Sequence, residues 1–338
     1  MRYIIIRGSG LGRGVFPEPS PPSYLIPFIF WLLPLVVLSS TPTNLVGIIG
    51  NPLSHSLSPV MQNAAFASLK LNWLYIALPV TNTSLKNLIK DLSYINCQGI
   101  NITIPHKQNV IQYIAELTPI ARHTGAVNTL VKTLNGSWIG TNTDVEGFMA
   151  PLKTRNINWK TKKAVVLGCG GSARAVVIAL TKLEFYSIII AGRNMTSLQK
   201  FVDTCKEMSP QLKYTLWNSD STNTLETEYF QQALKEADLI VNSTPIGMKR
   251  KYDSLKNFDT PLTDLQIDML KDKAIIYDLI YTPRPTSLLI KAASKGHDCI
   301  DGLEMLVQQG AASLRLWTGI QDVPVHVMRN AALTSLYN

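Results

Sequence analysis

A glycine-rich segment at residues 168–173, Gly-Cys-Gly-Gly-Ser-Ala, has residue types and a spacing that could bind phosphate. Gly168 would let the chain turn tightly, and Gly170 has no Cβ to block an approaching pyrophosphate. Ala173 stands where a third small residue lets a helix pack closely on a strand. A helix that begins here would offer free N–H groups and a positive dipole end to phosphates. The segment therefore predicts a dinucleotide site.

The residues on either side can supply the elements that such a site needs. Residues 163–167 are a short apolar run typical of a strand, a small-residue helical pattern continues to Lys182, and residues 187–191 form a second apolar run. Strand, glycine turn, helix and strand in this order make the first unit of a dinucleotide-binding sheet. A plain glycine-rich turn between a strand and a helix is the alternative.

The end of the second apolar run indicates which dinucleotide would bind. A site for NAD places a carboxylate there to accept hydrogen bonds from the ribose 2′-hydroxyl. This sequence has Gly192-Arg193-Asn194 instead, with no acidic residue from 187 to 193. The forked donors of a guanidinium match the oxygens of a 2′-phosphate. Arg193 therefore favours NADP(H), the alternative being an arginine that is merely solvated in a loop.

Length and composition limit the classes of protein. A chain of 338 residues can form two domains, and 46% hydrophobic with 16% charged residues is typical of a globular fold. The net charge of +9 is spread without a dense basic run, which favours a basic site for small anions over nucleic acid. The four cysteines and five histidines are dispersed, which argues against a metal site and suits a reducing cytoplasm.

Residues 1–43 differ in character from the rest. Residues 24–38 are apolar but contain Pro27 and Pro34, and the run is shorter than the ~20 residues that a membrane-spanning helix needs. Basic residues before an apolar run are typical of a signal peptide, yet the prolines and the lack of an A-x-A site weaken that interpretation. We expect an accessory extension without a catalytic role, and a start codon assigned too early would account for it. A membrane tether is the alternative.

Polar residues follow several expected strands in the first half of the chain. Ser56 and Ser58 come after a strand at residues 45–50 and precede a helix that would begin near Pro59, with Ser58 as its N-cap. Their spacing fits helix capping and a carboxylate site equally well. Lys107 lies just past another expected strand, where a lone lysine is usually solvated. Residues 125–131 and 138–144 form two more expected strands around an Asn135-Gly136 turn.

Seven motifs occur in collinear order along residues 45–335 and extend these separate signals. They are Ser-Leu-Ser-Pro at 56–59, Asn-Ile-Thr-Ile-Pro-His-Lys at 101–107, Gly-Ala-Val-Asn-Thr at 125–129, Asn-Thr-Asp at 142–144, Asn-Ser-Thr-Pro-Ile-Gly-Met at 242–248, Tyr-Thr-Pro at 281–283 and Gly-Leu-Glu-Met-Leu-Val-Gln-Gln at 302–309. Together they resemble the shikimate dehydrogenase family. The resemblance leaves residues 1–43 unexplained.

The resemblance implies an α/β fold in three parts. These are an N-terminal α/β substrate domain at residues 44–145, a Rossmann-type dinucleotide-binding domain at 146–302, and a C-terminal helical segment at 303–338 that packs back on the substrate domain. It implies reversible NADPH-dependent reduction of 3-dehydroshikimate to shikimate, in the route to chorismate and the aromatic amino acids. The expected enzyme is cytoplasmic, takes small-molecule substrates without nucleic acid or metal, and is compatible with a homodimer.

The resemblance also implies roles for single residues, matched position by position. Lys107 and Asp144 would be the catalytic pair. The substrate would be held by Ser56, Ser58, Thr103, Asn128, Tyr281 and Gln309. The cofactor would be held by Gly168, Cys169, Gly170, Gly171, Ser172, Gly192, Arg193, Asn194, Thr244, Ile246, Leu279 and Gly302.

These roles fit the chemistry of ketone reduction, which adds a hydride to carbon and a proton to oxygen. The cofactor supplies the hydride, so the protein must manage the proton and the developing negative charge. An ammonium beside the carbonyl oxygen can stabilise the alkoxide and protonate it. Lys107 is the candidate, and Asp144 would orient its ammonium and accept a hydrogen bond from a substrate hydroxyl. A structural ion pair is the alternative.

Two positions depart from the family pattern. Gln62 stands where the family commonly has His, and an amide cannot titrate, so we expect no catalytic role for this residue. The triplet at 192–194 is Gly-Arg-Asn where the family often has Asn-Arg-Thr, which keeps the charge and changes the contacts beside it. A quinate/shikimate dehydrogenase of broader specificity and a non-catalytic NADP-binding regulator are the alternative functions.

Overall fold

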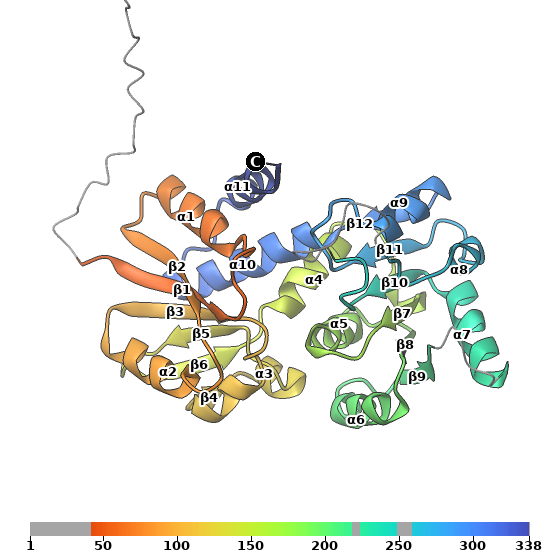
Figure 1. Cartoon of the computed structure of the whole chain (residues 1–338), viewed down its shortest axis with the longest axis horizontal. Helices are drawn as coiled ribbons and strands as arrows, with labels where there is room; N and C mark the ends of the chain where they lie inside the picture. Colours follow the sequence, from red (N-terminus) through yellow and green to blue (C-terminus); the bar gives the residue numbers. More distant parts are fainter. Residues whose placement is uncertain (1–41, 218–223, 249–258, 338) are drawn as a thin grey trace, which may run out of the picture. The chain divides into compact units, whose positions relative to one another are not determined.

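Two six-stranded sheets organise the computed structural model of the chain, which describes residues 42–217, 224–248 and 259–337 (Figure 1). Most of the expected extension, residues 1–41, lies outside the described ranges. Among the helices that can be described, none is both long enough and apolar enough to cross a bilayer.

The first sheet is mixed, with the strand order β2-β1-β3-β5-β6-β4. β1 pairs in parallel with β2 and β3, β5 runs antiparallel to β3 and β6, and β4 is parallel to β6. The strands are β1 (Asn44–Gly50), β2 (Trp73–Pro79), β3 (Cys97–Ile102), β4 (Glu116–Leu117), β5 (Thr129–Lys132) and β6 (Trp138–Thr141).

Both faces of the first sheet are covered by helices, which is why its central strands are apolar on both sides. On β1, Val46 and Ile48 join one buried cluster and Ile49 joins the other. One face is covered by α1 (Ser58–Ser68), α10 (Gly302–Thr318) and α11 (Val325–Tyr337). The other is covered by α2 (Leu85–Tyr94), the 3₁₀ helix η1 (Asn109–Tyr113) and α3 (Pro119–Thr124) (Figure 1).

The second sheet is fully parallel, with the order β12-β11-β10-β7-β8-β9. Read from the β9 edge, this is the 3-2-1-4-5-6 order of a Rossmann fold, and its switch point lies between β7 and β10. The strands are β7 (Lys163–Leu167), β8 (Ser187–Gly192), β9 (Leu212–Leu216), β10 (Leu239–Asn242), β11 (Ile275–Asp278) and β12 (Asp298–Ile300).

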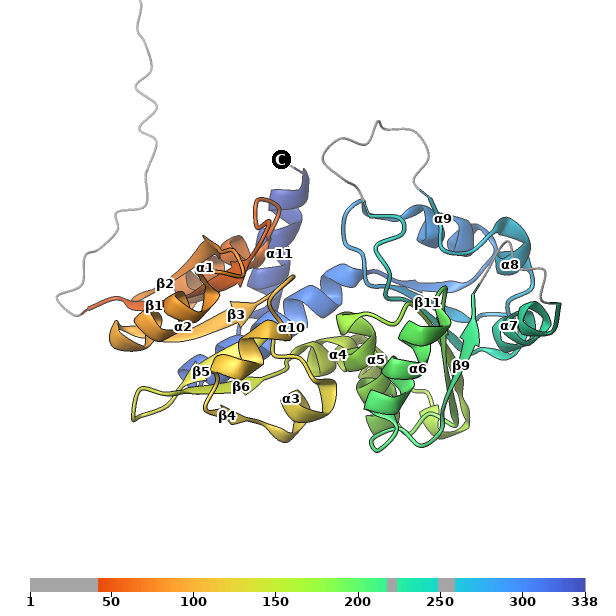
Figure 2. The same cartoon turned by 60° about the horizontal axis from the view of Figure 1, so that its bottom comes forward.

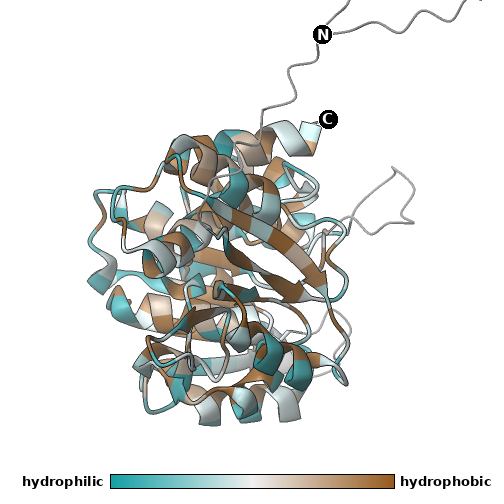
Figure 3. Cartoon of the chain, turned by 90° about the vertical axis from the view of Figure 1, so that its left-hand side faces the viewer, coloured by the Kyte–Doolittle hydropathy of each residue, from teal (hydrophilic) through white to brown (hydrophobic). Residues whose placement is uncertain are grey.

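Helices also cover both faces of the second sheet. On β7, Val166 joins the cluster under α5 (Gly171–Lys182) and α6 (Met195–Cys205), whereas Val165 faces α7 (Thr224–Glu236), α8 (Asp264–Asp268) and α9 (Ser287–Ser294). Figure 2 shows α5 and α6 together on one side and α7 to α9 on the other. In Figure 3 the strands are mainly brown, as expected for chains buried between helix layers.

Two helices, α4 (Asp144–Lys153) and α10, connect the sheets. They pack along each other, and α4 also packs against α5 (Figure 1). Gly147 permits this approach, because a Cβ there would lie 2.7 Å from Met305 O and 2.8 Å from Gln309 Cβ. The 3₁₀ helix η2 (Trp159–Thr161) precedes β7. The expected C-terminal helix that returns to the first sheet is confirmed, because residues of α10 and α11 complete the core over β1.

The structure corrects three local predictions. Leu57, not Ser58, is the N-cap of α1, and Ser58 is its first residue. The expected strand at residues 125–131 begins only at Thr129, because Gly125 has φ +57° and ends α3. The expected strand at 138–144 ends at Thr141, since Asp144 already begins α4.

Candidate active site

Lys107 and Asp144 form an ion pair, with Nζ 2.6 Å from Oδ2. The side chains are 20% and 9% exposed, so the pair is shielded but can be reached from solvent. Lys107 lies in the loop after β3 and Asp144 is the first residue of α4, which follows β6. Because β5 pairs with both β3 and β6, the sheet brings these two segments together.

The backbone of Lys107 is held on both sides. Its carbonyl accepts a hydrogen bond from Val127 N at 2.8 Å. The preceding His106 is fully buried, and its Nε2 lies 2.7 Å from Val80 O. Since a carbonyl can only accept, Nε2 carries the proton. This anchoring fixes the backbone from which the Lys107 side chain extends to Asp144.

The Asp144 carboxylate is oriented by its surroundings. Asn128 Nδ2 donates to its Oδ1 at 2.8 Å, which leaves Oδ2 for Lys107. The Asp144 N–H donates to Asn142 Oδ1 at 3.0 Å. The carboxylate also lies in the first turn of α4, where the positive end of the helix dipole stabilises negative charge. Each carboxylate oxygen of Asp144 thus has a partner in the protein, Asn128 for Oδ1 and Lys107 for Oδ2.

Gln309 of α10 extends this group. Asn128 Nδ2 lies 3.4 Å from Gln309 Oε1, and Gln309 Nε2 donates to Leu306 O at 2.8 Å. Four of the predicted residues, Lys107, Asp144, Asn128 and Gln309, are therefore linked in one group, although Asn128 and Gln309 are 181 residues apart in the sequence. The arrangement combines an ammonium, a carboxylate and two amides, which can bind the hydroxyl groups of a polar ring.

The other four predicted substrate residues make no hydrogen bond to this group within the described ranges. Ser56 Oγ accepts from Ser58 N at 3.4 Å, so both serines lie at the start of α1. Thr103 packs against Gly50, where a Cβ would lie 2.3 Å from its methyl group. Burial raises the pKa of Tyr281, so its hydroxyl stays protonated and can donate. Their roles remain predictions.

Gln62 is fully buried and joins α1 to α10. Its Nε2 donates to Gly310 O at 2.9 Å, whereas its Oε1 has no hydrogen-bond partner among the described residues. Gly310 follows Gln309 directly, so this bond supports the segment of α10 that carries a predicted substrate residue.

The glycine turn has room for a pyrophosphate. Gly168 has φ +97°, a conformation that favours glycine. A Cβ at Gly170 or at Gly171 would meet no atom within 4 Å, so open space lies beside both. The N-terminus of α5 has no side-chain cap, which leaves its N–H groups free for phosphate oxygens. The predicted turn fits the cofactor group that it was expected to hold.

A second loop at the switch point is fixed by buried polar contacts. Asn242 Oδ1 accepts from Thr244 N at 3.1 Å and Thr244 Oγ1 at 2.7 Å. Asn242 Nδ2 donates to Asp278 Oδ1 at 3.0 Å, and Ile246 N donates to Thr244 Oγ1 at 3.1 Å. Burial raises the pKa of Asp278 to about 6, although three hydrogen bonds oppose the rise.

The remaining predicted cofactor residues lie at the same edge of the sheet, as their strands require. A Cβ at Gly168 would lie 2.7 Å from Thr244 Cγ2, and one at Gly192 would lie 3.5 Å from Cys169 Sγ. A Cβ at Gly302 would lie 2.1 Å from Leu279 O, so only glycine fits there.

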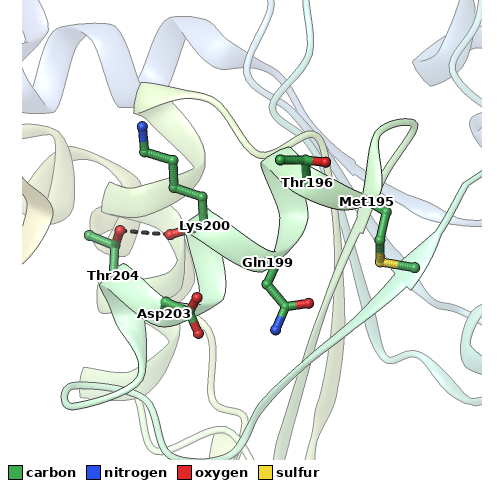
Figure 4. Close-up of a pocket in the computed structure, with 6 residues that line it drawn as sticks. All are labelled: Met195, Thr196, Gln199, Lys200, Asp203 and Thr204. Carbon is green, nitrogen blue, oxygen red and sulfur yellow. Dashed lines mark hydrogen bonds between the residues drawn. The ribbon is translucent and has the colours of Figure 1, made fainter.

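Arg193 is exposed and makes no hydrogen bond or ion pair within the described ranges, which leaves its guanidinium free. Asn194 caps α6, because its Oδ1 accepts from Ser197 N at 2.8 Å, and its Nδ2 remains available. Figure 4 shows a shallow pocket on α6 that contains none of the predicted residues. It is lined by Met195, Thr196, Gln199, Lys200, Asp203 and Thr204.

A contact between α3 and α5 brings the two groups of predicted residues toward each other. Arg174, in the first turns of α5, donates from Nη1 to Thr124 O at 3.4 Å. A Cβ at Gly125 would lie 2.6 Å from the same nitrogen. Two residues beyond Gly125, Val127 binds the Lys107 carbonyl. The Lys107–Asp144 pair and the glycine turn are thus joined through one short stretch of chain.

Three buried residues that form hydrogen bonds near this site, His106, Ser313 and Tyr75, were not predicted. His106 lies within a quoted motif, yet its role as an anchor depends on Val80, which is 26 residues away. Ser313 lies one helical turn after Gln309, and that spacing could have placed it on the same face of α10. Tyr75 sits in an apolar strand and gives no local signal.

The parallel sheet, the glycine turn at its switch point and the lysine–carboxylate pair define a dinucleotide-dependent dehydrogenase. The chain is 44% identical over 292 residues to the shikimate dehydrogenase (NADP(+)) of Prochlorococcus marinus strain MIT 9301, covering 86% of this chain and 98% of that protein. It belongs to the shikimate dehydrogenase family.

Family profiles and solved structures agree with this assignment. The shikimate dehydrogenase substrate binding domain matches residues 48–130, and the shikimate 5′-dehydrogenase C-terminal domain matches residues 302–333. Shikimate 5-dehydrogenase from Thermus thermophilus, in complex with NADP(H) and shikimate, is 29% identical with a TM-score of 0.73, covering 87% of this chain and 100% of that one. Quinate dehydrogenase from Corynebacterium glutamicum, in complex with NAD, is 28% identical with a TM-score of 0.74, covering 86% and 99%.

Proposed function

We infer that the chain catalyses the reversible NADPH-dependent reduction of 3-dehydroshikimate to shikimate, in the route to chorismate and the aromatic amino acids. The observation that carries this inference is the contact of Lys107, Asp144, Asn128 and Gln309 at one site. Membership of the family indicates which substrate binds, and a ring with several hydroxyl groups suits the donors and acceptors at this site.

Lys107 acts at the ketone oxygen. Its ammonium stabilises the negative charge that develops on this oxygen and then donates a proton from Nζ to form the hydroxyl. In the reverse direction the neutral amine takes the same proton back. The ion pair with Asp144 keeps Nζ directed, because Asp144 Oδ2 lies 2.6 Å away. Because the pair is shielded from solvent, the interactions of Lys107 with Asp144 and with the ketone oxygen are stronger than they would be in water.

Asp144 and the surrounding amides hold the substrate. Asp144 accepts a hydrogen bond from a ring hydroxyl, while Asn128 and Gln309 contact the others. Ser56 and Ser58, at the start of α1, bind the substrate carboxylate together with Thr103 and Tyr281. Hydroxyl donors at a helix N-terminus suit an anion. These roles are proposals that follow from position and residue type.

The cofactor supplies the hydride when it is bound. Gly168, Cys169, Gly170, Gly171 and Ser172 would hold its pyrophosphate, which the open space beside the glycines supports. Thr244, Ile246, Leu279 and Gly302 would lie along the nicotinamide half. Gly192, Arg193 and Asn194 would meet the 2′-phosphate.

An absorbance assay at the NADPH band tests the function. The full chain with 3-dehydroshikimate and NADPH should lose that absorbance, and with shikimate and NADP⁺ should gain it. A folded protein that binds NADPH but gives no change in either direction would support the non-catalytic regulator instead.

Replacing Arg193 with alanine is expected to raise the KM for NADP⁺ by about 10- to 100-fold, the worth of a hydrogen bond to a charged group. The KM for NAD⁺ should stay nearly constant, because NAD⁺ has no 2′-phosphate. Lys200→Ala, at an exposed position of α6, is the matched control and should alter neither value. Equal effects of Arg193→Ala on both cofactors would argue against the assignment.

Quinate/shikimate dehydrogenase activity is the second candidate, supported by the likeness to a quinate dehydrogenase. Kinetics with shikimate and quinate, each with NADP⁺ and NAD⁺, separate the two functions. A larger kcat/KM for shikimate with NADP⁺ supports the first, whereas comparable values for quinate with NAD⁺ support the second.

We also propose the three structural parts at residues 44–145, 146–302 and 303–338, a cytoplasmic location, the absence of a metal requirement, and a homodimer. Light scattering of the purified chain tests the dimer, and fractionation of cells tests the location.

A further inference from the structure

A buried row of hydrogen-bonded side chains lies behind the catalytic pair and has no role assigned above. Tyr75 of β2 donates from its hydroxyl to Asn101 Oδ1 at 2.8 Å. Asn101, on β3, donates from Nδ2 to Ser313 Oγ at 2.9 Å and to Thr129 Oγ1 at 3.1 Å. All four residues are at most 5% exposed. The row therefore spans β2, β3, β5 and α10 inside the protein.

The orientation of the Asn101 amide follows from Tyr75. An amide has one accepting oxygen and one donating NH₂ group, so a donor at Oδ1 forces Nδ2 toward Ser313. Burial raises the pKa of Tyr75 well above its usual value, and a hydrogen bond with Ser58 opposes that rise. The Tyr75 hydroxyl thus keeps its proton. Among the described residues, Asn101 Oδ1 accepts from no other side chain.

The same row reaches the catalytic carboxylate. Thr129 Oγ1 lies 2.9 Å from Ser313 Oγ and donates to Asn128 Oδ1 at 2.9 Å. Asn128 Oδ1 also accepts from Thr143 N at 2.7 Å. With its oxygen occupied, Asn128 directs Nδ2 toward Asp144 Oδ1 at 2.8 Å and Thr143 Oγ1 at 2.9 Å.

We propose that Tyr75 and Ser313 are positioning residues of the reaction. They hold the Asn101 amide in one orientation, and through the Thr129 hydroxyl this orientation sets Asn128 and the Asp144 carboxylate. The inference rests on the proposed function, because it assigns roles within that reaction.

A double-mutant cycle tests the proposal on the full chain, with kcat and KM measured for shikimate and NADP⁺. Tyr75→Phe and Ser313→Ala should each lower kcat roughly tenfold, the worth of one buried hydrogen bond. The KM for NADP⁺ should stay nearly constant. The kcat of the double variant should be little lower than that of the less active single variant, because both changes act through Asn101.

Two matched controls separate positioning from packing. Tyr277→Phe and Ser209→Ala remove the same groups from buried residues whose hydroxyls have no hydrogen-bond partner within the described part of the chain. They should leave kcat unchanged. If a test variant does not fold, Thr129→Val removes the linking hydroxyl, and Thr129→Ser should restore the kcat that valine loses.

The outcomes distinguish this proposal from the function on which it rests. A wild-type chain without dehydrogenase activity would overturn the proposed function. An active wild type with normal kcat in Tyr75→Phe and Ser313→Ala would overturn only the positioning roles. If the two fold-losses in kcat multiply in the double variant, the positioning roles would also be overturned, since independent sites give additive free energies.

Discussion

Replacing Lys107 with alanine is expected to lower kcat about a thousandfold in both directions, within the range for loss of a general acid. The variant loses the proton donor and the positive charge beside the developing alkoxide. NADP⁺ binding should remain nearly unchanged, because within the described part of the chain no hydrogen bond or ion pair links Lys107 to a proposed cofactor residue. Steady-state kinetics at the NADPH band and calorimetric titration with NADP⁺ measure the two quantities.

Lys132→Ala is the control for this prediction. Lys132 is a lysine of the same sheet, with its Nζ donating to Ile95 O at 2.7 Å in an exposed contact. Its loss should leave kcat close to that of the wild type. If Lys107→Ala retained more than a tenth of the turnover, the assignment of Lys107 as the proton donor would be wrong.

Replacing Asp144 with asparagine is expected to lower kcat on the order of a hundredfold. The amide keeps the shape of the side chain but lacks the charge that directs the Lys107 ammonium from 2.6 Å. It also adds an NH₂ group where the proposed role requires an acceptor for a substrate hydroxyl. The KM for shikimate should rise, while the KM for NADP⁺ should not. Kinetics with each substrate varied in turn measure both.

Glu146→Gln is a stringent comparison, because Glu146 lies in the same turn of α4 and pairs with Arg315. The Glu146 side chain is 58% exposed, and exposed pairs contribute little. This control should keep full activity. An Asp144→Asn variant as active as Glu146→Gln would show that the Lys107–Asp144 pair is structural.

The dinucleotide half of the fold could be predicted from local signals. The run from β7 through the glycine turn to α5 and β8 has its determinants within about thirty residues: apolar strands, glycines at the turn and small residues in the helix. Gly125 shows the opposite case. The residues that follow it have a pattern typical of a strand, but the positive φ of Gly125 ends α3, and β5 begins only at Thr129.

The contacts that organise the site could not be predicted from local patterns. Ser313 meets Asn101 across 212 residues, and the Asn128–Gln309 contact spans 181. These pairs form only because α10 returns to the first sheet, which depends on the packing of α4 against α10 at Gly147. The family resemblance predicted Asn128 and Gln309 as substrate residues, whereas the hydrogen bonds of Tyr75 and Ser313 were found only in the folded chain.

A crystal structure of the complex with shikimate and NADP⁺ measures the central quantity, the distance from Lys107 Nζ to the oxygen on the carbon that exchanges hydride. We expect a hydrogen bond of about 2.6–3.2 Å, with Asp144 contacting Nζ or a neighbouring ring hydroxyl. A bound shikimate whose reacting oxygen meets a different side chain, with Lys107 still paired only to Asp144, would contradict the account.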